Sequence, residues 1–154
     1  MSENVLKMRP AQAADLPAIV AMLADDPLGA TREELREPLP DAYLAAFAAI
    51  SDDSNQMLAV AERDGVVVGT LQLSFLPGLA RKGAWRGQIE AVRVAASARG
   101  IGLGKSMFGW AIEECRQRGC DLIQLTSDNA RPNAHRFYAS LGFVASHAGF
   151  KLTL

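Results

Sequence analysis

The chain has 154 residues, with 16 basic and 17 acidic side chains and a formal net charge of -1. That length is typical of one domain, and 49% hydrophobic with 21% charged residues excludes a disordered chain. The even charge balance argues against a nucleic-acid-binding protein, and no apolar run reaches the ~18 residues of a membrane span. Residues 1–4 lack the layout of a signal peptide. We therefore expect one domain over residues 1–154, located in the cytoplasm, without a nucleic-acid or membrane partner.

Soft metal ligands and nucleophiles are scarce in this sequence. The chain contains two cysteines, Cys115 and Cys120, and two histidines, His135 and His147. These residues are too few and too scattered for a disulfide framework or a zinc site, so we expect no metal. Cys120 is interpreted as a buried packing residue, because no histidine is placed to activate it.

Hydrophobic periodicity predicts an α/β protein. The first elements expected are strand Val5–Arg9, helix Leu16–Ala24, a helical turn near Arg32–Arg36 and helix Ala42–Ile50. Asp15 and Asp41 are expected to cap the two helices. The later elements expected are strands Met57–Arg63, Val66–Phe75 and Gln88–Val94, helix Gly102–Arg118, strand Leu122–Thr126, helix Asn133–Leu141, and a closing hairpin of Phe143–Ser146 and Gly149–Leu152. Asp64-Gly65 is a hairpin turn signal, and Gly119 suits a left-handed helix end.

A glycine-rich segment, Arg99–Ser106, lies between a predicted strand and the longest predicted helix. Glycines at alternate positions clear space for a ligand, and the N–H groups and dipole of the following helix favour an anion such as a diphosphate. A tight turn that needs glycine for its backbone angles is the alternative. A nucleotide-binding P-loop is a weaker alternative because Arg99 stands where that motif requires glycine, and the Gly-x-Gly-x-Gly spacing departs from the dinucleotide fingerprint.

The same segment resembles a third motif. Arg99-x-x-Gly102-x-Gly104 is similar to the Q/R-x-x-G-x-G/A signature of the GCN5-related N-acetyltransferases. Gln88–Val94 resembles the fourth strand of that family, and Ala134–Phe143 resembles its A-x-x-x-Y-x-x-x-G-F segment. The region from Ala134 to His147 is also similar to aminoalkylphosphonate acetyltransferases. The resemblance implies a mixed, mostly antiparallel sheet of about seven strands, flanked by helices on both faces and splayed between the fourth and fifth strands.

The resemblance also implies acetyl-CoA as cosubstrate. Backbone groups of Val92 and Val94 would bond the pantetheine arm, and the glycine loop would hold the diphosphate through N–H groups from about Ile101 to Ser106. The implied cofactor-binding residues are Val92, Arg93, Val94, Arg99, Gly100, Ile101, Gly102, Leu103, Gly104, Lys105, Ser106, Ala134 and Phe137. Many relatives carry asparagine seven residues before the tyrosine, where this chain has Arg131, so no pantetheine contact is assigned there.

Two residues are candidates for proton transfer. Glu90 could take the proton of the attacking ammonium, and burial beside Ile89 and Val92 would raise a carboxyl pKa toward a useful value. An exposed strand glutamate is the alternative. Tyr138 could protonate the leaving thiolate, because phenol and thiol pKa values of ~10 and ~8.5 are close. A core aromatic is the alternative for Tyr138, although Phe137 is the better candidate for that packing role.

We therefore predict an N-acetyltransferase that moves an acetyl group to a primary amine of a small molecule by direct transfer in a ternary complex. Two alternatives stay open: a non-catalytic acetyl-CoA sensor, and an enzyme that acetylates protein N-termini or lysines. A homodimer is also expected. The acceptor pocket would come from residues 25–39 and 76–87, with Trp85, Ser127 and His147 as substrate-binding candidates.

Overall fold

The computed structural model describes residues 6–154, in two compact units of which the first ends at Gln124 and the second begins at Leu125. The signal-peptide interpretation of residues 1–4 and the predicted strand start at Val5 lie outside the described residues. None of the described helices has the length and apolarity that crossing a membrane would require.

The first unit contains a sheet of five strands and most of the helices. Its elements are β1 (Lys7–Pro10), η1 (Ala13–Asp15), α1 (Leu16–Ala24), α2 (Gly29–Arg32), α3 (Asp41–Asp52), β2 (Gln56–Arg63), β3 (Val66–Pro77), α4 (Ala80–Gly83), β4 (Trp85–Val94), η2 (Ala96–Ala98), α5 (Leu103–Gln117) and β5 (Leu122–Gln124). The second unit contains α6 (Pro132–Ser140).

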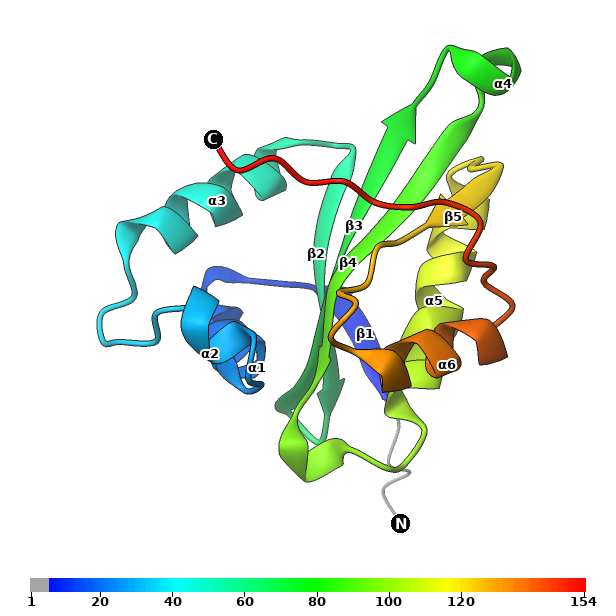
Figure 1. Ribbon diagram of the computed structural model, residues 1–154. Helices are drawn as coiled ribbons and strands as arrows, with labels where there is room; N and C mark the ends of the chain where they lie inside the picture. Colours follow the sequence, from blue (N-terminus) through cyan, green and yellow to red (C-terminus); the bar gives the residue numbers. More distant parts are fainter. Residues whose placement is uncertain (1–5) are drawn as a thin grey trace. The chain divides into compact units, whose positions relative to one another are not determined.

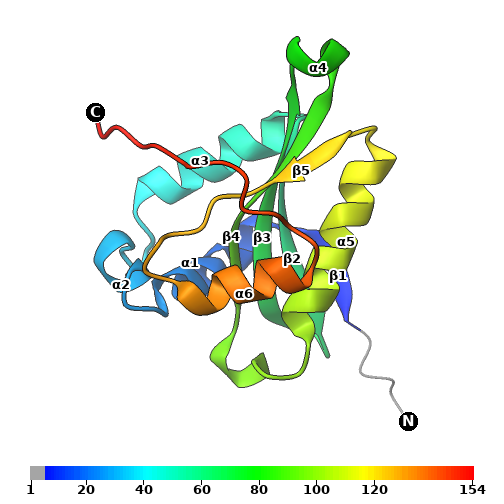
Figure 2. The same ribbon diagram turned by 45° about the vertical axis from the view of Figure 1, so that its right-hand side comes forward.

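The strands lie in chain order, and every neighbouring pair is antiparallel except β4 and β5, which are parallel. Helices cover both faces of this sheet (Figures 1 and 2). The face that α5 covers is marked by Gly69 and Gly87, where a Cβ would collide with Met107 and Cys115 of that helix. The opposite face carries the core cluster of Leu16, Ile19 and Val60 beneath α1. The sequence prediction of an α/β sheet with helices on both faces is confirmed.

The predicted turns are confirmed by their backbone angles. Asp64 and Gly65, between β2 and β3, have φ values of 52° and 77°, the left-handed pair that a tight two-residue hairpin requires. Gly119, after α5, has φ 79°, and its N–H donates to the carbonyl of Arg116. Glycine is favoured at these positions because other residues strain the backbone there.

The predicted helix caps are wrong in detail. Asp15 precedes α1, but its carboxylate accepts hydrogen bonds from Arg9 Nη1 and the backbone N–H of Gln12, each at 2.7 Å, and does not cap the helix. The Arg9 guanidinium competes for this carboxylate and lowers its pKa. Asp41 is the first residue of α3, after Pro40, and makes no side-chain cap bond. The helical turn expected near Arg32–Arg36 forms earlier, as α2.

The expectation of about seven strands is wrong for the described chain, which has five. Residues 143–154 contain no strand, and β5 ends at Gln124, short of the predicted Thr126. A hairpin is marginal without a neighbouring strand to pair with. Here the local bond is from Ser146 N–H to Val144 O at 2.9 Å, which makes a tight turn and no ladder. Phe143 is half-buried, but other apolar residues of the expected strands stay exposed, with Phe150 at 94% and Leu152 at 86%.

The contact between Gly87 and α5 gives a stability test. We expect Gly87→Ala to lower the free energy of unfolding by about 1–3 kcal/mol, because the added methyl group overlaps Cys115 Sγ in a packed interface. Urea denaturation measures the loss, and adding Cys115→Ala should restore part of it. Gly109→Ala on α5 is the matched control, since a Cβ there meets open space and should not destabilise. Equal stability of Gly87→Ala and the parent would contradict the packing described.

Candidate active site

The central feature of the first unit is an irregularity in β4. Gln72 pairs with Glu90 and Thr70 pairs with Arg93, so Ala91 and Val92 together oppose the single residue Leu71. This is a β-bulge, and Ala91 has the left-handed φ of 54°. On its other edge, β4 pairs with β5 only from Arg86 to Gln88. Among the described strands, the edge of β4 beyond Gln88 therefore has no partner.

The glycine loop follows β4 directly through η2. Gly100 and Gly102 have φ values of 81° and 78°, so both occupy the left-handed region that favours glycine. Leu103 and Ala98 are buried at 7% and 1% and fix the loop at both ends. The N–H of Ser106 donates to Gly102 O at 3.2 Å, which begins the helical bonding of α5. The N–H groups before Ser106 have no acceptor inside the helix, and they suit an anion. The N–H of Ser106 already has this partner, and the binding of an anion by the loop stays a prediction.

Two acidic residues that follow α1 hold an arginine at the end of β4 and the arginine that begins the glycine loop. Asp26 pairs with Arg93 at 3.4 Å, and Asp25 pairs with Arg99 at 3.3 Å. The same arginines donate to β4 carbonyls: Arg93 Nη1 to Val92 O at 2.9 Å and Arg99 Nε to Val94 O at 3.2 Å. A carbonyl has two lone pairs, so each still has room for a second donor. The sequence analysis included Asp25 and Asp26 only as part of the predicted pocket segment, residues 25–39, and did not foresee these ion pairs.

Glu90 lies one residue before the bulge and is exposed. The expectation that burial would surround its carboxylate is wrong; its neighbour Ile89 is the buried residue, at 2% exposure. Gln88 Nε2 donates to Glu90 Oε1 at 2.9 Å. In the described part of the chain, Oε2 accepts no hydrogen bond, so it is available to a ligand. Pairing with Gln72 places Glu90 on the sheet face that α1 and α3 cover.

A cavity of about 140 Å³ lies on that face, beside the bulge. Its walls come from α1 and α3 and its floor from β2, β3 and β4, with Gln72 and Ala91 at the floor. The lining is almost entirely apolar, and it includes Tyr43, Phe47 and Leu58. The predicted pocket segments, residues 25–39 and 76–87, do not line this cavity.

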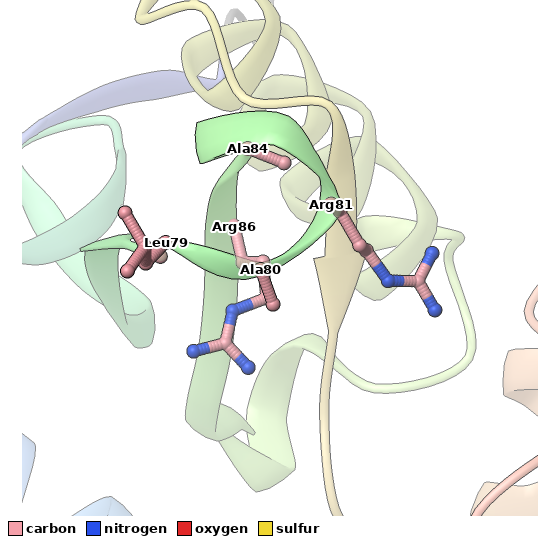
Figure 3. Close-up of a pocket in the computed structure, with 6 residues that line it drawn as sticks. Leu79, Ala80, Arg81, Ala84 and Arg86 are labelled. Atoms are coloured by element: carbon pink, nitrogen blue, oxygen red, sulfur yellow. The ribbon is translucent and has the colours of Figure 1, made fainter.

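A second cavity of about 290 Å³ lies at the β3–β4 turn and is lined by part of the predicted segment, including Leu79, Arg81 and Arg86. Figure 3 shows that the guanidinium groups of Arg81 and Arg86 leave this turn in different directions. The two guanidinium groups do not point toward one another, so in this arrangement they would not bind one anion together.

Most of the remaining predicted site residues belong to the second unit, which begins at Leu125. Tyr138 is half-buried in the last turn of α6, and its ring makes edge-to-face contacts with Phe137 at 5.8 Å and Phe143 at 6.2 Å between centroids. Phe137 was expected to take the buried packing role in place of Tyr138. That expectation is wrong, because Phe137 is also half-buried and its ring contacts Tyr138. Gly142, at φ 94°, ends the helix, and the N–H of Phe143 donates to Tyr138 O at 3.1 Å.

The less specific candidates have varied environments. Ser127 and Ala134 are half-buried, and His147 is exposed with Nδ1 2.6 Å from Ser146 Oγ. Arg131 is the residue before α6. Trp85 pairs with Pro77 at the start of β4, and strand alternation puts it on the α5 face, opposite to Glu90. Cys120 is half-buried, and burial raises the pKa of its thiol, which fits an unreactive residue.

Sequence reasoning missed the polar side chains that surround Glu90. Gln88, Gln124 and Arg86 join Glu90 through side-chain hydrogen bonds on one face of β4 and β5. The alternation of Arg86, Gln88 and Glu90 was a readable signal, because residues two apart in a strand share a face. The parallel register that brings Gln124 beside Gln88 was not readable from the sequence.

Comparison with known proteins agrees with this arrangement. The sequence profile of the Acetyltransferase (GNAT) family matches residues 20–143. Aminoalkylphosphonate N-acetyltransferase of Salmonella typhimurium is 32% identical over 151 residues, which cover 97% of this chain and 92% of the relative. Glucosamine 6-phosphate N-acetyltransferase of Trypanosoma brucei brucei is 37% identical over 91 residues, which cover 58% of this chain and 59% of the relative. A crystal structure of a Bacillus halodurans protein described as a transcriptional regulator has a TM-score of 0.94 and 48% identity, covering 97% and 100% of the two chains.

The chain therefore belongs to the acetyltransferase (GNAT) family. It is an acyltransferase, an acetyl-CoA-dependent N-acetyltransferase, as the glycine loop and the strand before it indicated.

The left-handed backbone of the glycine loop gives a binding test. We expect Gly102→Ala to weaken coenzyme A binding by roughly ten-fold, since a side chain in this conformation costs about 1–2 kcal/mol and tilts the start of α5. Isothermal titration with coenzyme A measures the change. Gly109→Ala, in the middle of the same helix, is the control and should bind normally. Unchanged affinity in Gly102→Ala would remove the loop from the cofactor site.

Proposed function

We propose that this protein transfers the acetyl group of acetyl-CoA to the primary amine of a small molecule, directly and with both substrates bound. One observation carries the proposal: a single segment from Gln88 to Ser106 contains an open strand edge, an exposed carboxylate and a helix N-terminus for an anion. The family match covers this segment, which supports its assignment as the acetyl-CoA site.

The residues present fit coenzyme A. The N–H groups at the start of α5 have no intrahelical acceptor, and Gly100 and Gly102 add no side chain that would meet a diphosphate. Lys105 and Arg99 supply positive charge at the same loop. The edge of β4 near Val92 and Val94 would hold the pantetheine arm, with Ala134 and Phe137 as further contacts by family resemblance. When bound, acetyl-CoA supplies the acetyl group as an activated thioester.

The chain's own residues would then move two protons. An alkylammonium has a pKa of ~10, so at neutral pH the acceptor needs a base before its nitrogen can attack the thioester carbon. Glu90 would take that proton, either directly or through a water molecule, with Oε2 as the accepting atom. As the carbon–sulfur bond breaks, Tyr138 would donate its phenolic proton to the departing thiolate.

A small acceptor is supported by two kinds of observation. The cavity beside the bulge has a volume of about 140 Å³, enough for a short aliphatic group and too small for a peptide segment. The names of two relatives state small amines that carry a phosphonate or a phosphate group. We therefore place amines with a phosphorus oxyanion first among the candidates. A protein N-terminus or lysine is the alternative acceptor.

The test is thiol release from acetyl-CoA in the presence of single amines. The panel contains aminoalkylphosphonates, glucosamine 6-phosphate, polyamines, amino acids and aminoglycosides, together with peptides that offer a free N-terminus or lysine. We expect turnover with a small amine and the background rate without one. Turnover with the peptides alone would contradict the small-molecule assignment.

The role of Glu90 is tested by Glu90→Gln, which keeps the shape of the side chain and removes the base. We expect kcat/KM to fall by roughly 10²-fold or more, with loss of the acidic limb of the pH–rate profile. Glu113→Gln is the matched control, because Glu113 lies exposed on α5 and pairs with Arg116. A wild-type pH–rate profile in Glu90→Gln would exclude Glu90 as the base.

The role of Tyr138 is tested by Tyr138→Phe. The ring contacts with Phe137 and Phe143 survive in this variant, and thermal unfolding checks that it stays folded. We expect kcat to fall by roughly 10²-fold, because the thiolate leaves without a proton donor. Tyr43→Phe serves as a comparison and not as a silent control, because Tyr43, the chain's other tyrosine, lines the cavity beside the bulge. Full turnover in Tyr138→Phe would show that another group protonates the thiolate.

A single acetyltransferase domain over residues 1–154, a cytoplasmic location and a homodimer remain predictions from the sequence.

A further inference from the structure

A series of side-chain hydrogen bonds crosses β4 and β5 and ends at the Glu90 carboxylate. Arg86 Nη1 donates to Gln124 Oε1 at 3.5 Å, Gln124 Nε2 donates to Gln88 Oε1 at 3.0 Å, and Gln88 Nε2 donates to Glu90 Oε1 at 2.9 Å. Arg86, Gln88 and Glu90 alternate along β4 and therefore share a face. Gln124 joins them because its strand is in register with Gln88.

The two ends of this series fix the direction of every bond in it. Arg86 has donors and no acceptor, so Gln124 must turn its amide oxygen toward it. Gln124 then has only its amide NH2 to offer Gln88, which in turn directs its own NH2 at Glu90. An ionised carboxylate accepts hydrogen bonds only, so the last bond agrees with the first. Reversing either amide would bring two donors or two acceptors together.

Other polar and charged side chains near this face have partners of their own. On β3, Gln72 opposes Glu90, and its Nε2 donates to Gln56 Oε1 at 3.2 Å. On β4, Arg93 is paired with Asp26 of the segment after α1. On α3, the Tyr43 hydroxyl donates to Glu33 Oε2 at 3.1 Å, and the rest of the cavity wall from α1 and α3 is apolar.

We propose that Gln88 is a positioning residue for Glu90, and that Arg86 and Gln124 hold Gln88 in the orientation that this role requires. The proposal rests on the proposed function, in which Glu90 is the base. The bond to Oε1 fixes the rotation of an exposed carboxylate and leaves Oε2 directed at the acceptor.

The first experiment follows the glutamine side-chain amides by NMR while pH is lowered. We expect the Gln88 amide signals to shift as the carboxylate titrates, with a smaller shift at Gln124, and both shifts to vanish in Glu90→Gln. Gln56 is the matched internal control, because it lies on the same face and bonds Gln72 and Ser74 instead. A Gln88 amide that ignores pH overturns the proposal, whatever the activity of Glu90→Gln.

The second experiment measures kinetics of Gln88→Leu, Gln124→Leu and Arg86→Met, with Gln56→Leu as control. We expect kcat of Gln88→Leu to fall by roughly ten-fold with KM for acetyl-CoA unchanged, because the Glu90 carboxylate has lost the donor that fixes its rotation. Gln124→Leu and Arg86→Met should lower kcat in the same way by less. An effect of Gln88→Leu alone would overturn the role of Arg86 and Gln124.

The two experiments separate this proposal from the function on which it rests. A responsive Gln88 amide with full activity in Glu90→Gln would establish the contact and exclude Glu90 as the base. A silent amide with an inactive Glu90→Gln would keep the base and reject its positioning by Gln88. Thermal unfolding of each variant checks that the loss of a half-buried amide has not unfolded the sheet.

Discussion

The structure of the first unit depends on the unequal bonding of the two edges of β4. Toward β3, this strand is paired from Trp85 to Val94 except at the bulge, whereas toward β5 it is paired only from Arg86 to Gln88. The bulge at Ala91 and Val92 interrupts the pairing with β3 further along the strand, where the pairing with β5 has already ended. A strand held firmly on one side can leave backbone groups free on the other without unfolding. The open edge, the carboxylate beside it and the loop that follows all derive from this asymmetry.

The ion pairs after α1 complete that arrangement. Asp26 with Arg93 and Asp25 with Arg99 link the end of α1 to the end of β4 and to the glycine loop. The pair of Asp26 and Arg93 is about 20% exposed on each side and is therefore shielded from salt better than the pair at the loop, which is about half exposed. The strand end is thus the firmer anchor, and the loop is the part that has freedom to adjust to a ligand.

Periodicity predicted the long elements of the first unit well. The helices α1 and α5 each bury one face, and β2 and β3 are apolar runs that are buried on both faces of the sheet. Turn chemistry was equally readable at Asp64-Gly65 and Gly119, where the left-handed backbone leaves little choice of residue. The prediction of the closing strands was wrong. Alternation at Phe150 and Leu152 is compatible with a strand, but a strand forms only where a partner strand is present to pair with it. The bulge at Ala91 was not predictable, because alanine carries no signal for a left-handed φ. The bonding of Gln88 to Gln124 needed a register between strands that lie far apart in the sequence.

The β3–β4 turn has a practical consequence for handling this protein. Leu79 is 97% exposed there, and Arg81 and Lys82 are adjacent, exposed and in the left-handed region. Trypsin cuts after these two residue types, and exposed turns of this kind are the preferred places for limited proteolysis. A cut at this turn would leave β3 and β4 on different fragments that are still joined by the ladder from Pro77–Trp85 to Gly69–Val94. The turn is therefore the natural place to divide the chain into two pieces for reassembly, or to insert a reporter away from Glu90 and the glycine loop.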